Sequence, residues 1–220
     1  TVSKKNSHEE ILTKFREEKI DILIGTQMVV KGHDFPDVTL VGVISADSSL
    51  NFGDFKATER TFQTLTQVIG RAGRGEVEGR ALIQTYNPDN YAIEYAKIQD
   101  YNLFYNTEIM LRKQLKYPPF CDIILIDVSS TKLNELEDTE KRLHKYLKER
   151  VINEKFGLLL YSPVPAPIDK IKDRYRGRIL IKCKYDSRIK ELLIDSLKEF
   201  YKMKKKDVRV NIELNPNNML

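Results

Sequence analysis

At 220 residues, the chain is long enough for one large domain or two small ones, each with its own hydrophobic core. Apolar residues make up 41% and charged residues 31% of the sequence, and no run of 18 uncharged apolar residues is present to cross a bilayer. The net charge of +5 is unevenly placed, because residues 1–114 carry 14 Lys and Arg against 16 Asp and Glu, whereas residues 115–220 carry 23 against 16. The composition therefore excludes a membrane protein and places the positive charge in the second half.

The only two cysteines, Cys121 and Cys183, are too few for a disulfide framework and lack the paired spacing of a structural zinc site. The three histidines are scattered, so no metal site is predicted. The first residues contain neither a signal peptide's apolar segment nor an initiator Met, and they look like an internal cut of a longer chain. We expect a cytoplasmic fragment.

The first half of the chain has the alternating pattern of an α/β lobe. Apolar periodicity predicts helices over residues 8–18, 56–69, 89–97 and 101–115. β-branched runs predict buried parallel strands over residues 21–24 and 38–44, and residues 80–86 predict another strand. Tyr117-Pro118-Pro119 stops the last of these helices, because proline cannot continue a helix. We therefore predict a domain boundary there, with domains over residues 1–116 and 117–220.

The second half is predicted to have the order βαββαβ, which is the order of elements in the ferredoxin-like split βαβ sandwich. Its predicted elements are strands at 122–129, 157–162, 178–184 and 207–214 and helices at 133–151 and 187–203. Residues 162–168 contain three prolines and predict a stiff connector. The expected fold class is therefore α/β, with a parallel-sheet lobe followed by a smaller ferredoxin-like domain.

The stretch from Gln67 to Arg74 places Arg71 and Arg74 among glycines at the end of an amphipathic helix. A guanidinium is permanently charged and forked, so it can hold two phosphate oxygens and stabilise charge on a transferring phosphoryl group. Surface arginines that complement the helix dipole are the structural alternative, although the flanking glycines cost helix stability. The pattern favours phosphate binding.

A second polar stretch follows the predicted strand at 21–24. Gly25 and Thr26 offer an approachable backbone and a hydroxyl for a phosphate, and Asp34 follows Gly32 where a turn can expose it. An ordinary strand-to-helix loop explains the same residues.

These two stretches, about 40 residues apart, resemble motifs V and VI of superfamily 2 helicases, whose motif VI has the form QxxGRxxR. GTQMVVKGHDFPDVTLVGV, LNFGDFKATER, QVIGRAGR and KYPPF together resemble the primosomal replication-restart DNA helicases across essentially the whole chain. Gly53 is a small departure, because the family often has proline there. The resemblance implies that the first half is part of a RecA-like helicase lobe two, and that the full-length protein is an ATP-dependent 3′ to 5′ DNA helicase that recognises stalled or branched forks and restarts replication by primosome assembly.

The resemblance also implies residue roles. Arg74 is the first candidate for the arginine finger and Arg71 the second, and Gln67 matches the glutamine of the same motif. Gly32 and Asp34 match positions near the nucleotide. The positions that match DNA contacts in motif V are Gly25, Thr26 and Gln27. Lys31 and His33 match the family pattern without an assigned role.

Much of the family's machinery does not occur in this sequence. There is no GxxxxGK[ST] phosphate loop and no DExH box, so the groups that would hold ATP and Mg²⁺ are missing. The family's cysteine-rich zinc module is missing too. We expect ATP and Mg²⁺ to bind only to the full-length protein and the fragment alone to be inactive.

The basic charge of the second half is concentrated after the prolines. Five cations fall on alternate positions, so an extended chain would place them on one face, with Tyr175 nearby for stacking: Lys170, Lys172, Arg174, Arg176 and Arg178. An edge strand protected by positive charge is the alternative to contact with nucleic acid or an acidic peptide. In the family that the chain resembles, the matching strand helps to bind branched DNA and the acidic tail of single-strand-binding protein.

Two functions remain open from the sequence. The first is the helicase fragment, whose partners would be forked or single-stranded DNA, single-strand-binding protein and other primosome proteins. The second is a nucleic-acid or partner-binding module of another superfamily 2 translocase, without a role in restart. The residues KGHDFP and the βαββαβ pattern favour the first.

Overall fold

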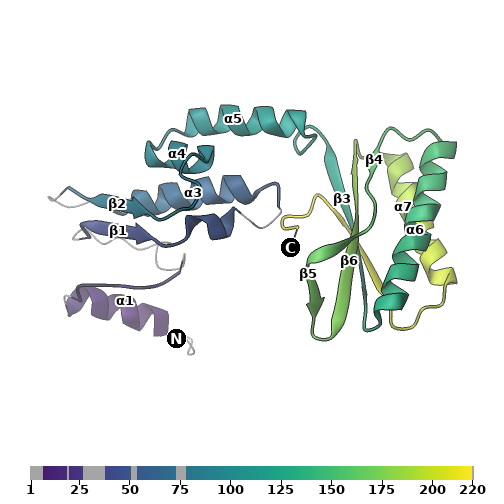
Figure 1. The fold of residues 1–220 in the computed structure, drawn as a ribbon, viewed down its shortest axis with the longest axis horizontal. Coiled ribbons are helices and arrows are strands. Elements are labelled where there is room, and N and C mark those ends of the chain that lie inside the picture. The colour runs from purple at the N-terminus through teal and green to yellow at the C-terminus, as the bar shows by residue number, and fades with distance from the viewer. Residues whose placement is uncertain (1–6, 19, 27–37, 51–53, 73–77, 220) are drawn as a thin grey trace. The chain divides into compact units, whose positions relative to one another are not determined.

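The computed structural model describes residues 7–18, 20–26, 38–50, 54–72 and 78–219 (Figure 1). The chain divides into two compact units. Residues Thr1–Leu50 and Thr58–Phe104 form the first, and residues Asn51–Ala57 and Tyr105–Leu220 form the second.

The first unit contains a short parallel sheet covered by helices. Strands β1 and β2 pair in parallel, with Leu40 opposite Arg80 and Val43 opposite Ile83, which confirms the strands predicted at residues 38–44 and 80–86. The full burial expected for the first of them is wrong, because alternate residues of both strands, Leu40 and Leu82 among them, are exposed. The elements that begin in this unit are α1 (Ser7–Glu17), β1 (Leu40–Val43), the 3₁₀ helix η1 (Ala46–Ser49), β2 (Arg80–Ile83), α4 (Tyr91–Lys97) and α5 (Tyr101–Gln114). Helix α3 (Ala57–Ile69) starts at Ala57, which ends the segment Asn51–Ala57 of the second unit, and its remaining residues belong to the first unit.

The core of the first unit is made by one stripe of α3 and by the residues that face it. Phe62 and Leu65 of α3 are buried together with Ala92 and Ala96 of α4. Phe62 stacks on Phe104, with ring centroids 4.0 Å apart and planes inclined by 6°. The apolar spacing that predicted an amphipathic helix over residues 56–69 is therefore the spacing of its buried stripe.

The strand predicted at residues 21–24 is wrong. None of the described strands pairs with this segment, and the side chains of Ile22 and Ile24 are 74% and 88% exposed. A strand needs a neighbour for its backbone N–H and C=O groups, and a β-branched run alone does not provide one.

The second unit is built on an antiparallel sheet with two helices. The order of the strands is β4-β6-β3-β7, and β5 also pairs with β6. This is the order that a ferredoxin-like βαββαβ unit requires, since the first and third strands lie in the middle of the sheet. Its elements are β3 (Asp122–Ser130), α6 (Leu133–Asn153), β4 (Leu159–Leu160), β5 (Val164–Ile171), β6 (Arg174–Cys183), α7 (Ser187–Lys202) and β7 (Arg209–Leu214).

The proline-rich segment is a strand, and its prediction as a connector is wrong. Val164–Ile171 forms β5, which pairs antiparallel with β6 and is irregular between Pro165 and Lys170. Proline is compatible with this position because β5 lies at the edge of the sheet. Lys172 and Asp173 form the two-residue turn into β6, and both have positive φ, of 46° and 61°.

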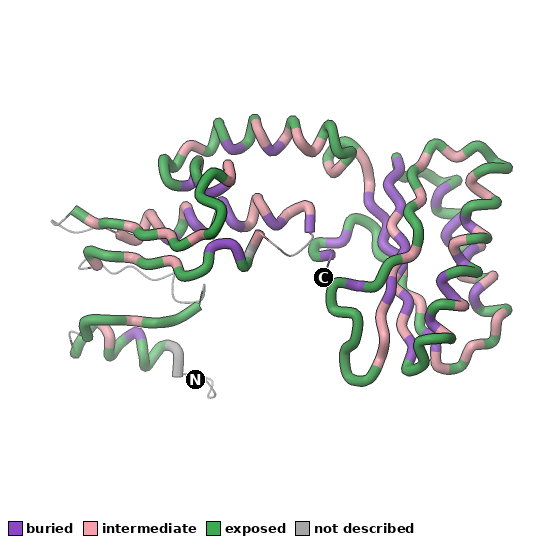
Figure 2. Tube along the Cα trace, viewed as in Figure 1, coloured by how far each residue is buried: buried purple, intermediate pink, exposed green. Residues whose placement is uncertain are grey.

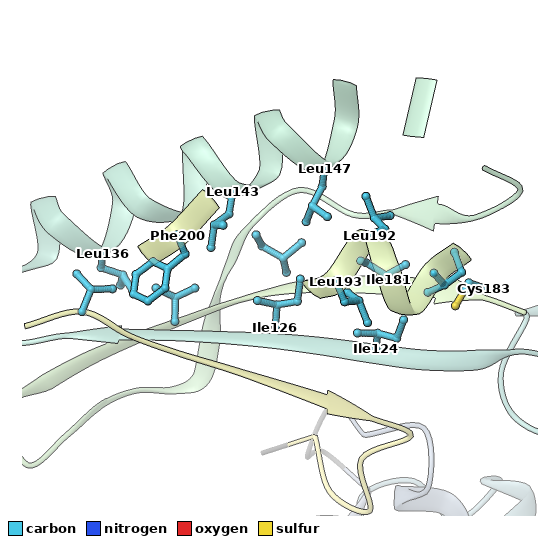
Figure 3. Packing of buried hydrophobic residues seen from close by; sticks show 14 residues of the cluster. Ile124, Ile126, Leu136, Leu143, Leu147, Ile181, Cys183, Leu192, Leu193 and Phe200 are labelled. Carbon is cyan, nitrogen blue, oxygen red and sulfur yellow. The ribbon is translucent and has the colours of Figure 1, made fainter. Parts of the chain in front are cut away.

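The core of the second unit lies between the sheet and the two helices. Figure 2 shows buried positions concentrated in the central strands and recurring along both helices. In Figure 3, Ile124, Ile126 and Ile181 of the strands face leucines of α6 and the apolar stripe of α7. The close packing of these side chains supplies most of the hydrophobic stabilisation of this unit. None of the described helices combines the length and apolar character needed to cross a bilayer.

Candidate functional site

The arginine segment begins where α3 ends. Gln67 is exposed on the last turn of the helix, one residue before the buried Val68, and Arg71 is half-buried. The buried stripe of α3 therefore fixes which way Gln67 points. Arg74 lies outside the described residues.

Gly70 continues the winding of α3. The N–H of Gly70 donates to the carbonyl of Thr66 at 3.0 Å, and the N–H groups of Arg71 and Ala72 donate to carbonyls three residues back. This is the tightened last turn that is common at helix ends. The φ angle of Gly70 is not in the left-handed region, and a Cβ there would lie 3.3 Å from the Thr66 carbonyl oxygen. Arg71 thus follows the helix through a tightened turn. At Gly70 the lack of a side chain allows the close approach of the Thr66 carbonyl, and the backbone angles there are ordinary.

The structure describes only the start of the other predicted phosphate-binding stretch. Gly25 and Thr26 are exposed in an irregular segment. Gln27, Gly32 and Asp34 lie outside the described residues, as do Lys31 and His33. The roles expected for these residues stay predictions.

The five alternating cations do not share one face, and that expectation is wrong. Because the chain reverses at Lys172 and Asp173, Lys170 lies opposite Tyr175 on the face that packs against the helices. Arg174, Arg176 and Arg178 alternate with core residues of β6, so they lie on the opposite face of the sheet, which we call the outer face. The cations form a hairpin with charge on both sides and at its tip.

Arg174 is held by neighbouring strands. Its guanidinium donates to the carboxylate of Asp207 at 3.1 Å, to the carbonyl of Ser129 at 3.0 Å and to the carbonyl of Asp207 at 2.5 Å. The same carboxylate accepts from Ser130 and from the N–H and hydroxyl of Thr131. These hydrogen bonds, led by the one from the Thr131 N–H, hold the pKa of Asp207 well below its usual range. Arg174 therefore joins the end of β3 to the start of β7.

Arg178 is also engaged within the chain. Its guanidinium donates to the carbonyl of Met219, a residue that is 6% exposed. Burial lowers the pKa of Arg178, while the nearby Asp127 raises it. Burial in turn raises the pKa of Asp127, against the opposing charges of Arg176 and Arg178. The half-buried Asp127 thus lies on the outer face near both Arg176 and Arg178, with Arg176 having the larger effect on its charge.

Arg176 and Lys172 are the cations of this hairpin that make no hydrogen bond or ion pair within 4 Å among the described residues. Lys172 is exposed in the turn, whereas Arg176 is half-buried and its charge favours the ionised form of Asp127. Lys170 is engaged on its own face, where its ammonium lies 4.9 Å from the centre of the Tyr175 ring and 3.4 Å from the Asp173 carboxylate. The alternation of charges predicted a cationic surface. It did not reveal that Arg174 is ion-paired with Asp207, because Asp207 lies 33 residues further along the chain.

Comparisons with known proteins match both halves of the chain. Residues 113–217 match the family model described as primosomal protein N C-terminal domain, and residues 3–76 match the helicase conserved C-terminal domain. Replication restart protein PriA of Bacillus subtilis is 42% identical over 221 residues, which covers 100% of this chain and 27% of that protein. The chain belongs to the PriA family.

Other PriA proteins give the same result over slightly shorter stretches. PriA of Synechocystis is 42% identical over 88% of this chain and 23% of its own length. PriA of Chlamydia pneumoniae is 40% identical over 84% of this chain and 24% of its own length. The chain thus spans about a quarter of the length of these curated relatives.

The family matches agree with the elements that carry the candidate residues. The helicase match contains α3, Gln67 and both motif VI arginines. The PriA C-terminal match contains every strand of the antiparallel sheet, including the cationic hairpin β5–β6. The resemblance that the motifs indicated is confirmed at the level of the family.

Proposed function

We propose that this chain is part of an ATP-dependent DNA helicase that moves 3′ to 5′ on DNA and restarts replication at stalled or branched forks by assembling the primosome. The observation that carries the proposal is the placement of Gln67 and Arg71 at the end of α3, inside the segment that matches a helicase C-terminal domain. Two guanidinium groups three residues apart suit the oxygens of a phosphoryl group. The protein would act in the cytoplasm.

In this proposal the arginines act on a nucleotide that other parts of the full-length protein hold. Arg74 is the arginine finger, Arg71 assists it, and Gln67 lies beside them. Gly32 and Asp34 lie near the nucleotide, and Gly25, Thr26 and Gln27 contact the DNA backbone. ATP and Mg²⁺ bind where the phosphate loop and DExH box occur, and zinc binds in a separate module, so residues 1–220 alone have no ATPase activity.

The second half of the chain serves recognition in the same proposal. We assign residues 1–116 to helicase lobe two and residues 117–220 to a basic C-terminal domain. Its hairpin contacts forked or single-stranded DNA or the acidic tail of single-strand-binding protein, with Arg176 and Lys172 as the leading cations, and other primosome proteins bind the full-length protein. A permanently charged guanidinium without an internal ion pair is suited to phosphate or carboxylate oxygens.

The experiment is a steady-state ATPase assay of the full-length protein with and without forked DNA. Arg74→Ala should lower the DNA-stimulated kcat by about a thousandfold or more while nucleotide binding persists, because an arginine finger acts mainly on the transition state. Arg80→Ala is the matched control, since Arg80 is exposed on β2 and has no proposed role. Turnover by Arg74→Ala near the unsubstituted rate would refute the finger assignment.

Absence of DNA-dependent ATP turnover in the unsubstituted full-length protein would favour the alternative. The chain would then be a nucleic-acid or partner-binding module of a different superfamily 2 protein. The net positive charge of residues 115–220 is compatible with both functions.

A further inference from the structure

A further arginine lies on the outer face of the antiparallel sheet, outside the cationic hairpin. Arg209 is the first residue of β7, and Ser129 of β3 lies directly opposite it. Val210 and Ile212, which alternate with the outward positions of β7, pack against the core of the second unit. Because successive side chains of a strand point to opposite faces, Arg209 points away from α6 and α7, which lie on the other side of the sheet (Figure 1).

The register of the sheet places Arg209 and Arg176 on either side of one residue. Ser129 pairs with Arg176 of β6 on one side and with Arg209 of β7 on the other. Residues directly opposite each other on neighbouring strands share a face, so all three side chains lie on the outer face. Since neighbouring strands lie about 4.8 Å apart, the backbones of the two arginines are roughly 10 Å apart across the sheet. We call Arg176 and Arg209 the outer-face pair.

Arg209 is the arginine of the outer face that the chain itself engages least. It is exposed, and within the described part of the chain its guanidinium makes no hydrogen bond and no ion pair within 4 Å. Arg174 and Arg178 donate to acceptors of the same domain, and Arg176 is half-buried near Asp127. A guanidinium stays charged across the physiological pH range, so that of Arg209 is available to an anion from outside.

Acidic groups restrict where an anion can lie on this face. Asp127 and Glu213 lie on it at two and four residues from the row of the outer-face pair. Asp207 is closer to the pair, but its carboxylate is already ion-paired with Arg174. A chain of negative charges is therefore repelled from the middle of the outer face and attracted to the end that carries the outer-face pair.

The central strands offer no surface on which bases could stack. RNA-recognition motifs, which also use a small sheet, stack bases on its aromatic side chains. In β3 and β6 as the structure describes them, the outer-face positions carry no aromatic residue, and Tyr175 of β6 packs on the core side. Contacts here are therefore limited to the sugar-phosphate backbone, which carries no direct sequence information.

We propose that Arg209 contacts the phosphate backbone of a nucleic acid on the outer face of the sheet, together with Arg176 across Ser129. The inference rests on the proposed function, which assigns nucleic-acid recognition to this domain, and it extends the site from the hairpin to the strand at the opposite edge of the sheet. A serine hydroxyl between two guanidinium groups adds a further donor for phosphate oxygens. Because each neutralised phosphate releases counterions, binding at Arg209 depends on salt and is independent of sequence.

The test is a fluorescence titration of the full-length protein with forked DNA at several salt concentrations. Arg209→Ala should reduce the slope of log affinity against log salt by about 1, whereas Arg209→Lys, which keeps the charge, should retain the slope. Two forks of different sequence should lose the same fold of affinity. Lys145→Ala is the matched control, since it removes one positive charge from α6, where the Lys145 side chain is 79% exposed, and it should leave the slope unchanged.

Several outcomes would overturn the inference. These are an unchanged slope in Arg209→Ala, an equal fall in Lys145→Ala, and a loss of affinity confined to one DNA sequence. Weaker binding of an aspartate-rich peptide by Arg209→Ala, with the DNA slope intact, would make the site one for carboxylates and would also overturn it. Arg209→Gln removes the charge but keeps most of the side chain, and it serves if Arg209→Ala fails to fold.

The same titrations separate this inference from the proposed function. If forked DNA does not stimulate ATP turnover but Arg209→Ala still lowers the slope, the helicase function fails and the phosphate contact stands. If forked DNA stimulates turnover and the slope does not depend on Arg209, only the inference fails. If the unsubstituted protein does not bind forked DNA, both fail.

Discussion

The guanidinium of Arg174 donates to both the carboxylate and the backbone carbonyl of Asp207, and it thereby joins the first residue of β6 to the segment that leads into β7. The Arg174 side chain is 20% exposed. Its third acceptor, the carbonyl of Ser129, belongs to the strand that lies between β6 and β7. One side chain therefore ties three neighbouring strands together at one end of the sheet.

Arg174→Ala should destabilise the protein. Removing the guanidinium leaves the carbonyls of Ser129 and Asp207 without this donor, and a part-buried acceptor without its hydrogen bond is costly. We expect the melting temperature of the second unit to fall by about 5 °C. Arg176→Ala is the matched control, and an equal fall in that variant would contradict the structural role of Arg174.

Asp207 should make the protein sensitive to acid. Its folded-state pKa lies below the unfolded value, so its contribution to stability is present above the unfolded pKa and is lost as the pH falls through the folded pKa. Asp207→Asn should therefore lower stability at neutral pH, and its deficit relative to the unsubstituted protein should shrink in strong acid. Chemical unfolding across a pH series measures this, and a deficit that does not depend on pH would argue against it.

Arg176 should contribute more to nucleic-acid binding than to folding. No hydrogen bond or ion pair within 4 Å holds its guanidinium in the described part of the chain, although its charge favours the ionised form of the half-buried Asp127. Arg176→Ala should reduce the slope of log affinity against log salt by about 1 and lower the melting temperature less than Arg174→Ala does. Fluorescence titration of the full-length protein with forked DNA at several salt concentrations provides the measurement. A salt dependence equal to that of the unsubstituted protein would exclude a phosphate contact at Arg176.

The sequence predicted the two parallel strands and the ferredoxin-like order because both rest on periodicity, which is a local signal. The hairpin β5–β6 was missed for a local reason as well. Its turn has Lys172 and Asp173 at positive φ where glycine or asparagine is usual, and its first strand contains prolines. Each of these features argues against a strand when it is read alone.

The candidate site shows the other limit of sequence reasoning. The spacing of Arg71 and Arg74 made them candidates, and their role stays a prediction, whereas the partners of Arg174 and Arg178 come from residues more than 30 positions away. Alternation places side chains on faces, but it does not say which of them are already hydrogen-bonded. The ring of Phe55 stacks on that of Tyr117, 62 positions further along the chain, and neither aromatic residue is distinctive by itself.

A side chain at Gly177 should force the carboxylate of Glu140 to move. A Cβ at Gly177 would lie 2.0 Å from Oε1 of Glu140, a residue of α6 that is only 8% exposed. Gly177→Ala should therefore cost about 1–3 kcal/mol of unfolding free energy by overpacking. Combining it with Glu140→Ala should restore most of the loss. Gly157→Ala is the control, because no atom lies within 4 Å of a Cβ there, and a comparable cost in that variant would contradict the explanation.

Glu140 should make the second unit less stable as the pH rises. Burial raises the pKa of this carboxyl to about 7, with Glu137 adding to the shift and Lys141 opposing it, and its Oε1 has no hydrogen-bond partner among the described residues. Because the folded-state pKa exceeds the unfolded value of 4.5, folding takes up a proton, and stability declines between pH 4.5 and about 7.

Glu140→Gln should remove this dependence. A neutral amide does not have to lose a proton, so the variant should gain up to roughly 3 kcal/mol relative to the unsubstituted protein at pH 8 and little at pH 4.5. Glu149→Gln on the same helix is the control, since the Glu149 side chain is 61% exposed. Urea unfolding at the two pH values measures the effect. If Glu140→Gln changed the unfolding free energy by the same amount at pH 4.5 and pH 8, the carboxyl of Glu140 would not be the group that titrates. Glu140 would then affect stability only through its packing against Gly177.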